Sequence, residues 1–92
     1  MDGQRFDWDE NNIRHLARHR VSPEEAEQAI LDPQTKMLEI QTSEGDEERV
    51  KAIGRTADGR ILVTVFAFRG EAIRLVTAYR AAIREQRLYF DR

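Results

Sequence analysis

One stretch of the sequence, residues 61–68, constrains the fold more than any other. It reads ILVTVFAF and is apolar at almost every position, odd and even alike. Because successive side chains of a strand point to opposite faces of a sheet, such a strand needs cover on both sides. We therefore expect these residues to form a central β-strand at the heart of the core.

Shorter segments with a period of two surround this strand and predict an antiparallel meander. Residues 37–40 and 49–55 are expected to be strands joined by a turn at residues 43–46. Asp58-Gly59 supplies the positive φ angles of a hairpin that leads into the central strand. Residues 73–78 then form the last strand.

Helix signals stand before and after the meander. Residues 6–8 alternate as a very short strand, and Asp9 is placed to cap a helix that ends near His19. Ser22-Pro23 with Glu25 forms a capping box for a second helix, which Asp32-Pro33 ends.

A final helix is predicted over residues 80–90. Its apolar side is expected to carry four residues, Tyr79, Ala82, Ile83 and Phe90. Three arginines follow at i, i+4 and i+7 and predict one basic stripe, made of Arg80, Arg84 and Arg87.

Together these elements predict an α+β fold: a short N-terminal strand, two helices, an antiparallel β-meander and a C-terminal helix. A chain of 92 residues is long enough for one modest core, so residues 1–92 are expected to be a single domain. We expect it in the cytoplasm, because no apolar signal segment or membrane-spanning run is present.

The charge of the chain is divided between its halves. Residues 1–46 contain 5 Lys and Arg against 11 Asp and Glu, whereas residues 47–92 contain 10 against 6. The basic half is suited to binding phosphate locally. Neutralisation of one half by the other is an equally good reading.

Several kinds of chemistry are excluded or disfavoured. There is no Cys, which excludes disulfides, thiolate zinc sites and cysteine nucleophiles. The glycines are isolated rather than gathered in a phosphate-binding loop, so no nucleotide cofactor is expected. His15 and His19 have the i, i+4 spacing of metal ligands, but Leu16 stands where a metalloprotease has Glu and no third ligand is marked. No metal is expected.

Arginine remains as the group suited to catalysis. Cleavage of RNA by its own 2′-OH requires stabilisation of charge on phosphorus and the transfer of two protons. Arg74, with Arg80 and Arg84 at the following helix, is predicted to converge on one phosphate. His19 is the candidate for proton transfer, and a buried structural role at its helix end is the alternative. The arginines are also equally suited to pairing with Glu71, Glu85 and the acidic first half.

The sequence resembles the BrnT family of bacterial toxin components. The resemblance begins with Trp8-Asp9-Glu10, Asn12-Ile13-Arg14-His15, Ala17-Arg18-His19 and Val21-Ser22-Pro23-Glu24-Glu25-Ala26. It continues through Glu48-Arg49, Ala52-Ile53-Gly54-Arg55, Gly59-Arg60, Ile73-Arg74-Leu75-Val76-Thr77-Ala78, Arg84-Glu85 and Arg87-Leu88-Tyr89. It covers nearly the whole chain, and the order and spacing of these segments carry it.

The resemblance implies a RelE-like fold and metal-independent endoribonuclease activity on messenger RNA. It also implies a cognate BrnA-like antitoxin as partner, in a hetero-oligomer that represses its own operon. Four more basic residues are candidates for binding the RNA: Arg49, Lys51, Arg55 and Arg87.

Three positions depart from the family pattern. Arg20 stands where the family usually has Gly, Tyr79 where it usually has Arg, and Gln86 where Arg is common. These departures bring in a second hypothesis, a non-catalytic module with the toxin fold that acts only through an antitoxin or repressor complex.

Overall fold

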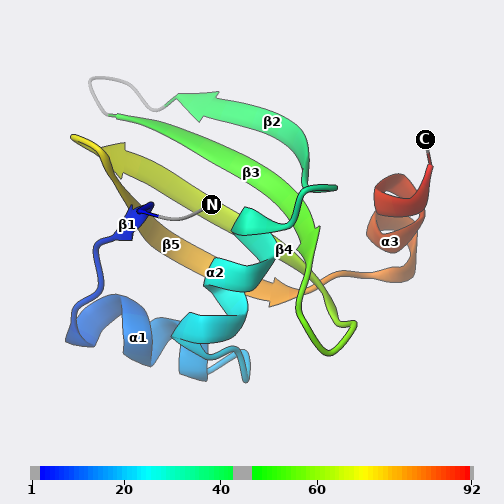
Figure 1. Ribbon diagram of the computed structural model, residues 1–92, viewed down its shortest axis with the longest axis horizontal. Helices are drawn as coiled ribbons and strands as arrows, with labels where there is room; N and C mark the ends of the chain where they lie inside the picture. Colours follow the sequence, from blue (N-terminus) through cyan, green and yellow to red (C-terminus); the bar gives the residue numbers. More distant parts are fainter. Residues whose placement is uncertain (1–2, 43–46, 92) are drawn as a thin grey trace.

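The structure, a computed structural model, describes residues 3–42 and 47–91. A mixed sheet in the order β1-β5-β4-β3-β2 carries α1 and α2 on one face and α3 near one end (Figure 1). The elements are β1 Arg5–Phe6, α1 Glu10–Ala17, α2 Pro23–Leu31, β2 Lys36–Thr42, β3 Glu48–Arg55, β4 Ile61–Arg69, β5 Ala72–Arg80 and α3 Ile83–Phe90. The predicted α+β class and order of elements are confirmed.

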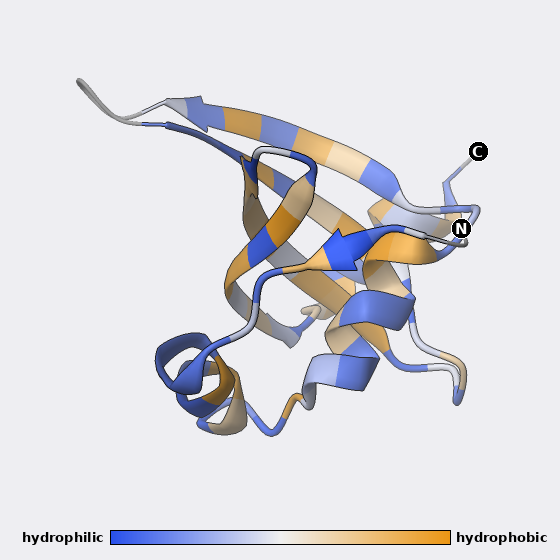
Figure 2. Cartoon of the chain, turned by 60° about the vertical axis from the view of Figure 1, so that its left-hand side comes forward, coloured by the Kyte–Doolittle hydropathy of each residue, from blue (hydrophilic) through white to orange (hydrophobic). Residues whose placement is uncertain are grey.

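β4 is the central strand that its composition predicts. Residues 61–67 are all buried, and β4 pairs antiparallel with β3 on one side and β5 on the other. Only Phe68 and Arg69 at its end are exposed, so the expected burial fails at Phe68. At the sheet edge, β2 instead alternates hydrophobic and hydrophilic residues over 38–41, visible as bands of colour in Figure 2.

The short first strand pairs in a way that the sequence does not reveal. β1 begins one residue earlier and ends two residues earlier than expected. It runs parallel to β5, with Arg5 opposite Ala72 and Phe6 opposite Ile73. β2, β3, β4 and β5 form the expected antiparallel meander. The predicted turn at residues 43–46 lies outside the described residues.

α1 begins as predicted, with Asp9 accepting a hydrogen bond from the N–H of Asn12 at 3.1 Å. It ends at Ala17, two residues before the predicted His19. The turn that follows has hydrogen bonds from Arg20 N–H to Ala17 and from Val21 N–H to Leu16, the pattern of a Schellman motif. Arg20 takes the left-handed position with φ +60°, which explains why glycine suits this position.

α2 packs unusually closely against β3. Its capping box is present as predicted, and Glu25 also binds Arg60 of the β3–β4 hairpin at 2.5 Å. At Gly54 of β3, an added Cβ atom would collide with the carbonyl of Ala29 in α2. Thr35 donates a hydrogen bond to the same carbonyl at 2.5 Å. The absence of a side chain at Gly54 therefore sets the distance between helix and sheet.

Two buried clusters lie on opposite faces of the sheet. Under α1 and α2, the larger one contains Leu16, Val21, Ala26, Ala29, Ala52, Leu62, Phe66, Ile73, Leu75 and Ala78. The smaller one lies under α3 and contains Ile53, Ile61, Val63, Ala81 and Tyr89. No described helix is long and apolar enough to cross a membrane.

The prediction for the last helix is wrong in two respects. Arg80 ends β5 rather than starting the helix, so the basic stripe of Arg80, Arg84 and Arg87 does not lie on one helix. The buried side is also different: Tyr89 is 4% exposed, whereas Ile83 and Phe90 are 68% and 59% exposed. β5 continues to Arg80, so the helix begins only at Ile83, and Tyr89 is the residue that packs on the cluster below it.

The contact at Gly54 gives a first prediction. Gly54→Ala should lower the free energy of unfolding by about 3 kcal/mol, since a backbone carbonyl cannot move aside without shifting α2. Urea denaturation followed by circular dichroism measures it. The control is Gly70→Ala in an exposed turn, where only the positive φ costs about 1 kcal/mol. Equal losses in the two variants would contradict the close packing.

The left-handed turn gives a second prediction. Arg20→Gly should raise the free energy of unfolding by about 1 kcal/mol, because relief of the left-handed strain outweighs the greater freedom of the unfolded chain. Arg18→Gly is the matched control. Arg18 has φ −62°, so its change to Gly should destabilise the protein by about 1 kcal/mol. A shift of the same sign in both variants would argue against the role given to Arg20.

Candidate functional site

A groove of about 440 Å³ lies where α1 meets the open end of the sheet. Side chains from α1, β3, β4 and β5 line it together with Glu47. The lining residues are Asn11, Asn12, His15, Glu47, Arg49, Ala67, Arg69, Arg74, Leu75, Val76 and Thr77. Three arginines and a histidine thus come together in one hollow.

The arginines share the face of the sheet that α3 leaves uncovered. On β4, Val65, Ala67 and Arg69 alternate with the residues that pack under α1 and α2, and Arg74 of β5 pairs with Ala67. Lys51 of β3 pairs with Val65. Arg49, two residues before Lys51, points to the same face. Three strands therefore place basic side chains side by side.

A β-bulge in β5 adds a hydroxyl to this face. The register of β5 shifts between Leu75 and Thr77, so Thr77 pairs with Val65 and Val76 has no partner on β4. The extra residue reverses the alternation. Thr77 consequently lies on the same face as Arg74, although the two are three positions apart in the sequence.

Two carboxylates hold Arg74 at the edge of the groove. Its guanidinium lies 2.9 Å from Asp9 and 3.5 Å from Asp7, and its side chain is only 20% exposed. The hydrogen bond from Asn12 N–H, with a further contribution from Arg74, holds the pKa of Asp9 below its ordinary value. The N-cap of α1 is thus also the anchor of this arginine.

Arg69 is fixed in a similar way. Its Nε and Nη2 donate to the two carboxylate oxygens of Glu47 at 2.9 and 3.0 Å. This two-point contact lowers the pKa of Glu47 and raises the pKa of Arg69. Arg49 makes no ion pair with any residue that the structure describes, so it is the least compensated cation of the groove.

His15 reaches the groove because Asn12 fixes α1 to the edge of β5. The side-chain amide of Asn12 donates to the carbonyls of Asp7 and Leu75 at 3.0 and 3.2 Å. One turn later, Nε2 of His15 lies 3.1 Å from the hydroxyl of Thr77. Fixed guanidinium groups beside an imidazole can bind a phosphate and move a proton.

The structure brings some of the predicted site residues together and separates others. Arg74 and Arg49 line the groove, and Lys51 lies on the same face of the sheet. Arg80 is six residues from Arg74 on the same strand, roughly 20 Å away. Arg84 and Arg87 follow on α3. The predicted convergence of Arg74, Arg80 and Arg84 on one phosphate is therefore not found.

The two histidines take different places. His19 is exposed, so the buried structural role considered for it is wrong. It does not line the groove, and its ring centroid lies 5.5 Å from that of His15 and 6.3 Å from that of Tyr79.

Sequence reasoning missed His15 and Arg69 as members of the site. The sequence marks His15 only through its metal-ligand spacing to His19, and it does not single out Arg69. The signal for His15 was its position three residues after Asn12, on the same side of α1. The sequence carries no comparable signal for Arg69, because its place depends on the pairing of three strands.

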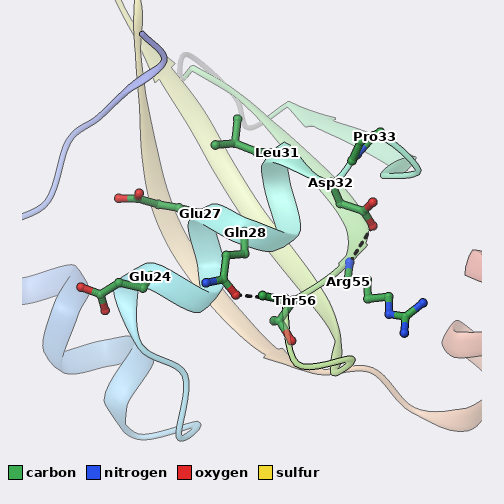
Figure 3. Close-up of a pocket in the computed structure, with 9 residues that line it drawn as sticks. Glu24, Glu27, Gln28, Leu31, Asp32, Pro33, Arg55 and Thr56 are labelled. Carbon is green, nitrogen blue, oxygen red and sulfur yellow. Dashed lines mark hydrogen bonds between the residues drawn. The ribbon is translucent and has the colours of Figure 1, made fainter. Parts of the chain in front are cut away.

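A second hollow, of about 540 Å³, lies between α2 and the β3–β4 hairpin (Figure 3). Its polar groups mainly hold the fold together: Gln28 accepts from Ala57 N–H at 2.9 Å, and Asp32 accepts from Arg55 N–H at 2.8 Å. Arg55, a predicted RNA contact, lines this hollow and not the groove. Although larger, it lacks the basic cluster, and we take the groove as the candidate site.

Comparison with known proteins identifies one family. A family model described as ribonuclease toxin, BrnT, of type II toxin-antitoxin system matches residues 8–85. No curated protein matches the chain.

The lowered pKa of Asp9 predicts a pH-dependent contribution to stability. A carboxyl with a depressed pKa in the folded state stabilises the protein above its unfolded pKa, and this stabilisation is lost as pH falls through the folded pKa. Asp9→Asn keeps a capping side chain but removes the charge. At pH 7 the urea midpoint of Asp9→Asn should lie below that of the wild type, and the two midpoints should converge toward pH 2.

The control for this experiment is Glu71→Gln. It removes an exposed carboxylate that only approaches Arg5, at 3.8 Å. A pH-dependent difference of the same size in both variants would show a general charge effect and no specific role for Asp9.

Proposed function

The chain belongs to the BrnT family of ribonuclease toxins of type II toxin-antitoxin systems, and we propose that it cuts messenger RNA in the groove beside β5 without a metal ion. The observation that carries the proposal is the meeting of Arg49, Arg69 and Arg74 with His15 in one hollow. Guanidinium groups and an imidazole together supply what cleavage by the 2′-OH requires.

The reaction has a simple balance of bonds and protons. The 2′-oxygen forms a bond to phosphorus while a base removes its proton, and the bond from phosphorus to the 5′-oxygen breaks. A proton then passes to the 5′-oxygen, which leaves a cyclic phosphate and a free 5′-hydroxyl. The arginines bind the phosphate oxygens, on which negative charge accumulates in the transition state.

We assign proton transfer to His15, because it lines the groove and lies against Thr77. His19, predicted from the sequence for this role, becomes the second candidate. Carboxylates already orient Arg74 and Arg69, whereas Arg49 is the arginine with most freedom to move with the phosphate during the reaction. Preorganised charge of this kind lowers the cost of reaching the transition state.

The other predicted arginines bind the RNA away from the cleaved bond. Arg80, Arg84 and Arg87 are exposed, and they suit contacts with the sugar-phosphate backbone. Lys51 takes the same role beside Arg49. Arg55 remains a proposed contact for RNA that extends around the β3–β4 hairpin.

The family also supports a proposal about the partner. A type II toxin is paired with a protein antitoxin, and we place a BrnA-like antitoxin over the outer side of α3 in a hetero-oligomer. That surface combines exposed Ile83, Leu88 and Phe90 with Arg84 and Arg87, a combination suited to an acidic amphipathic segment. A RelE-like fold, a single domain and a cytoplasmic location complete the proposal.

A non-catalytic role is the second candidate, and one observation favours it. Asp7, Asp9 and Glu47 already pair with Arg74 and Arg69. An RNA phosphate must therefore compete with carboxylates for both arginines. If that competition prevents reaction, the domain acts only by binding its antitoxin.

A cleavage assay separates the two. Purified protein with 5′-labelled messenger RNA and excess EDTA should release fragments that end in a cyclic phosphate. Arg74→Ala and His15→Ala should each reduce the cleavage rate by about 100-fold, because each removes a group acting in the transition state. Arg5→Ala is the matched control, since Arg5 is exposed and lies outside the lining of the groove.

Three results would contradict the proposal in different ways. Cleavage that stops in EDTA would show that the reaction needs a metal ion. Loss of cleavage in His19→Ala but not in His15→Ala would assign the proton transfer to His19. Absence of cleavage by folded wild-type protein favours the non-catalytic role.

A further inference from the structure

We propose that His19 and Tyr79 form a subsite on which an unpaired RNA base stacks, next to the groove. The inference rests on the proposed ribonuclease function and adds to it the place where one base of the substrate binds. Aromatic rings are the usual platforms for bases of single-stranded RNA.

The bulge in β5 places Tyr79 on the face that carries the arginines. Tyr79 pairs with Val63 and Thr77 with Val65, and these two β4 residues are on the same face as Ala67, the partner of Arg74. Arg74, Thr77 and Tyr79 therefore form one row along β5. Thr77 and Tyr79 are about 7 Å apart along the strand, a step that one nucleotide spans.

The imidazole rings of His15 in α1 and of His19 in the turn after it lie alongside this row. His15 contacts Thr77. The ring centroid of His19 lies 5.5 Å from that of His15 and 6.3 Å from that of Tyr79. His19 is held there by the turn after α1, in which its N–H donates to the carbonyl of Leu16 at 2.9 Å. The rings of His19 and Tyr79 thus lie next to His15, the proposed proton-transfer group.

The ring of Tyr79 is both supported and accessible. It packs against the buried cluster of Ile53, Val63 and Tyr89 under α3 and is only partly buried. His19 is exposed. A base that stacks on Tyr79 binds to a ring that is already packed in place, so little freedom of that side chain is lost on binding.

α1 lies along the edge of β5 at Leu75 and Thr77, and no described strand pairs with this edge beyond them. β1 pairs with β5 only at Ala72 and Ile73, and among the described residues no strand continues this pairing toward Arg80. A single strand of RNA can lie along this edge beyond Thr77, with a phosphate in the groove and the neighbouring base on Tyr79 and His19.

A binding experiment isolates the subsite from catalysis. The probe is a fluorescein-labelled single-stranded oligonucleotide with 2′-O-methyl sugars, which lack the attacking hydroxyl, and anisotropy gives its Kd for the full chain. Tyr79→Leu keeps an apolar side chain against the core but removes the ring. We expect Tyr79→Leu and His19→Ala to weaken binding about tenfold, and Tyr79→Phe to rescue it.

Phe68→Ala is the matched control. Phe68 is an exposed ring that shares the opposite face of the sheet with Phe66, so its loss should leave Kd unchanged. Probes with one abasic position at each site in turn complete the design. At one of these positions the difference between Tyr79→Leu and wild type should disappear, because there is no base left to stack.

The outcomes separate this inference from the proposed function. If wild type cleaves RNA while Tyr79→Leu binds the probe as tightly as wild type, the subsite is wrong and the ribonuclease stands. A tenfold loss of affinity in Tyr79→Leu that persists at every abasic position also overturns stacking. The loss would then come from a change in the fold or from contacts with the RNA backbone. If wild type neither binds nor cleaves, both proposals fall.

Discussion

Burial of β4 on both faces is the constraint on which the rest of the structure depends. A strand that is apolar on both sides must be covered on both sides. α1 and α2 cover one face along most of its length, whereas the eight residues of α3 cover only one end of the other. The part left open carries Lys51, Arg49, Arg69 and Arg74, and the candidate site is this uncovered part of the sheet.

Basic side chains gathered on one sheet surface repel one another unless carboxylates separate them. Asp7 and Asp9, from the acidic first half of the chain, reach Arg74, and Glu47 reaches Arg69. The division of charge along the sequence thus becomes contact between the halves in the fold. Neutralisation of one half by the other, as considered from the sequence, therefore holds in part at Arg74. Phosphate binding by the basic half stays a prediction, and Arg49, which makes no ion pair with a described residue, is its first candidate.

Local signals made most of the fold predictable, and the failures share one cause. Caps at Asp9 and Ser22 and the alternation of apolar residues depend on neighbours in sequence, and they predicted α1, α2 and the meander. The bulge at Val76, the length of β5 and the burial of Tyr89 depend on strand pairing. Arg69 has no local signal for the same reason, because only the assembled sheet brings it beside Arg74, whereas His15 has one in its spacing from Asn12.

The parallel pairing of β1 with β5 has a consequence for the newly made chain. The bond from Arg74 to the carbonyl of Asp7 spans 67 residues, and contacts of such long range form only after a large loop has closed. While the chain is still on the ribosome, α1 and α2 are synthesised well before β5. Because β5 is the last strand to be made, the groove is completed only when nearly the whole chain has been synthesised.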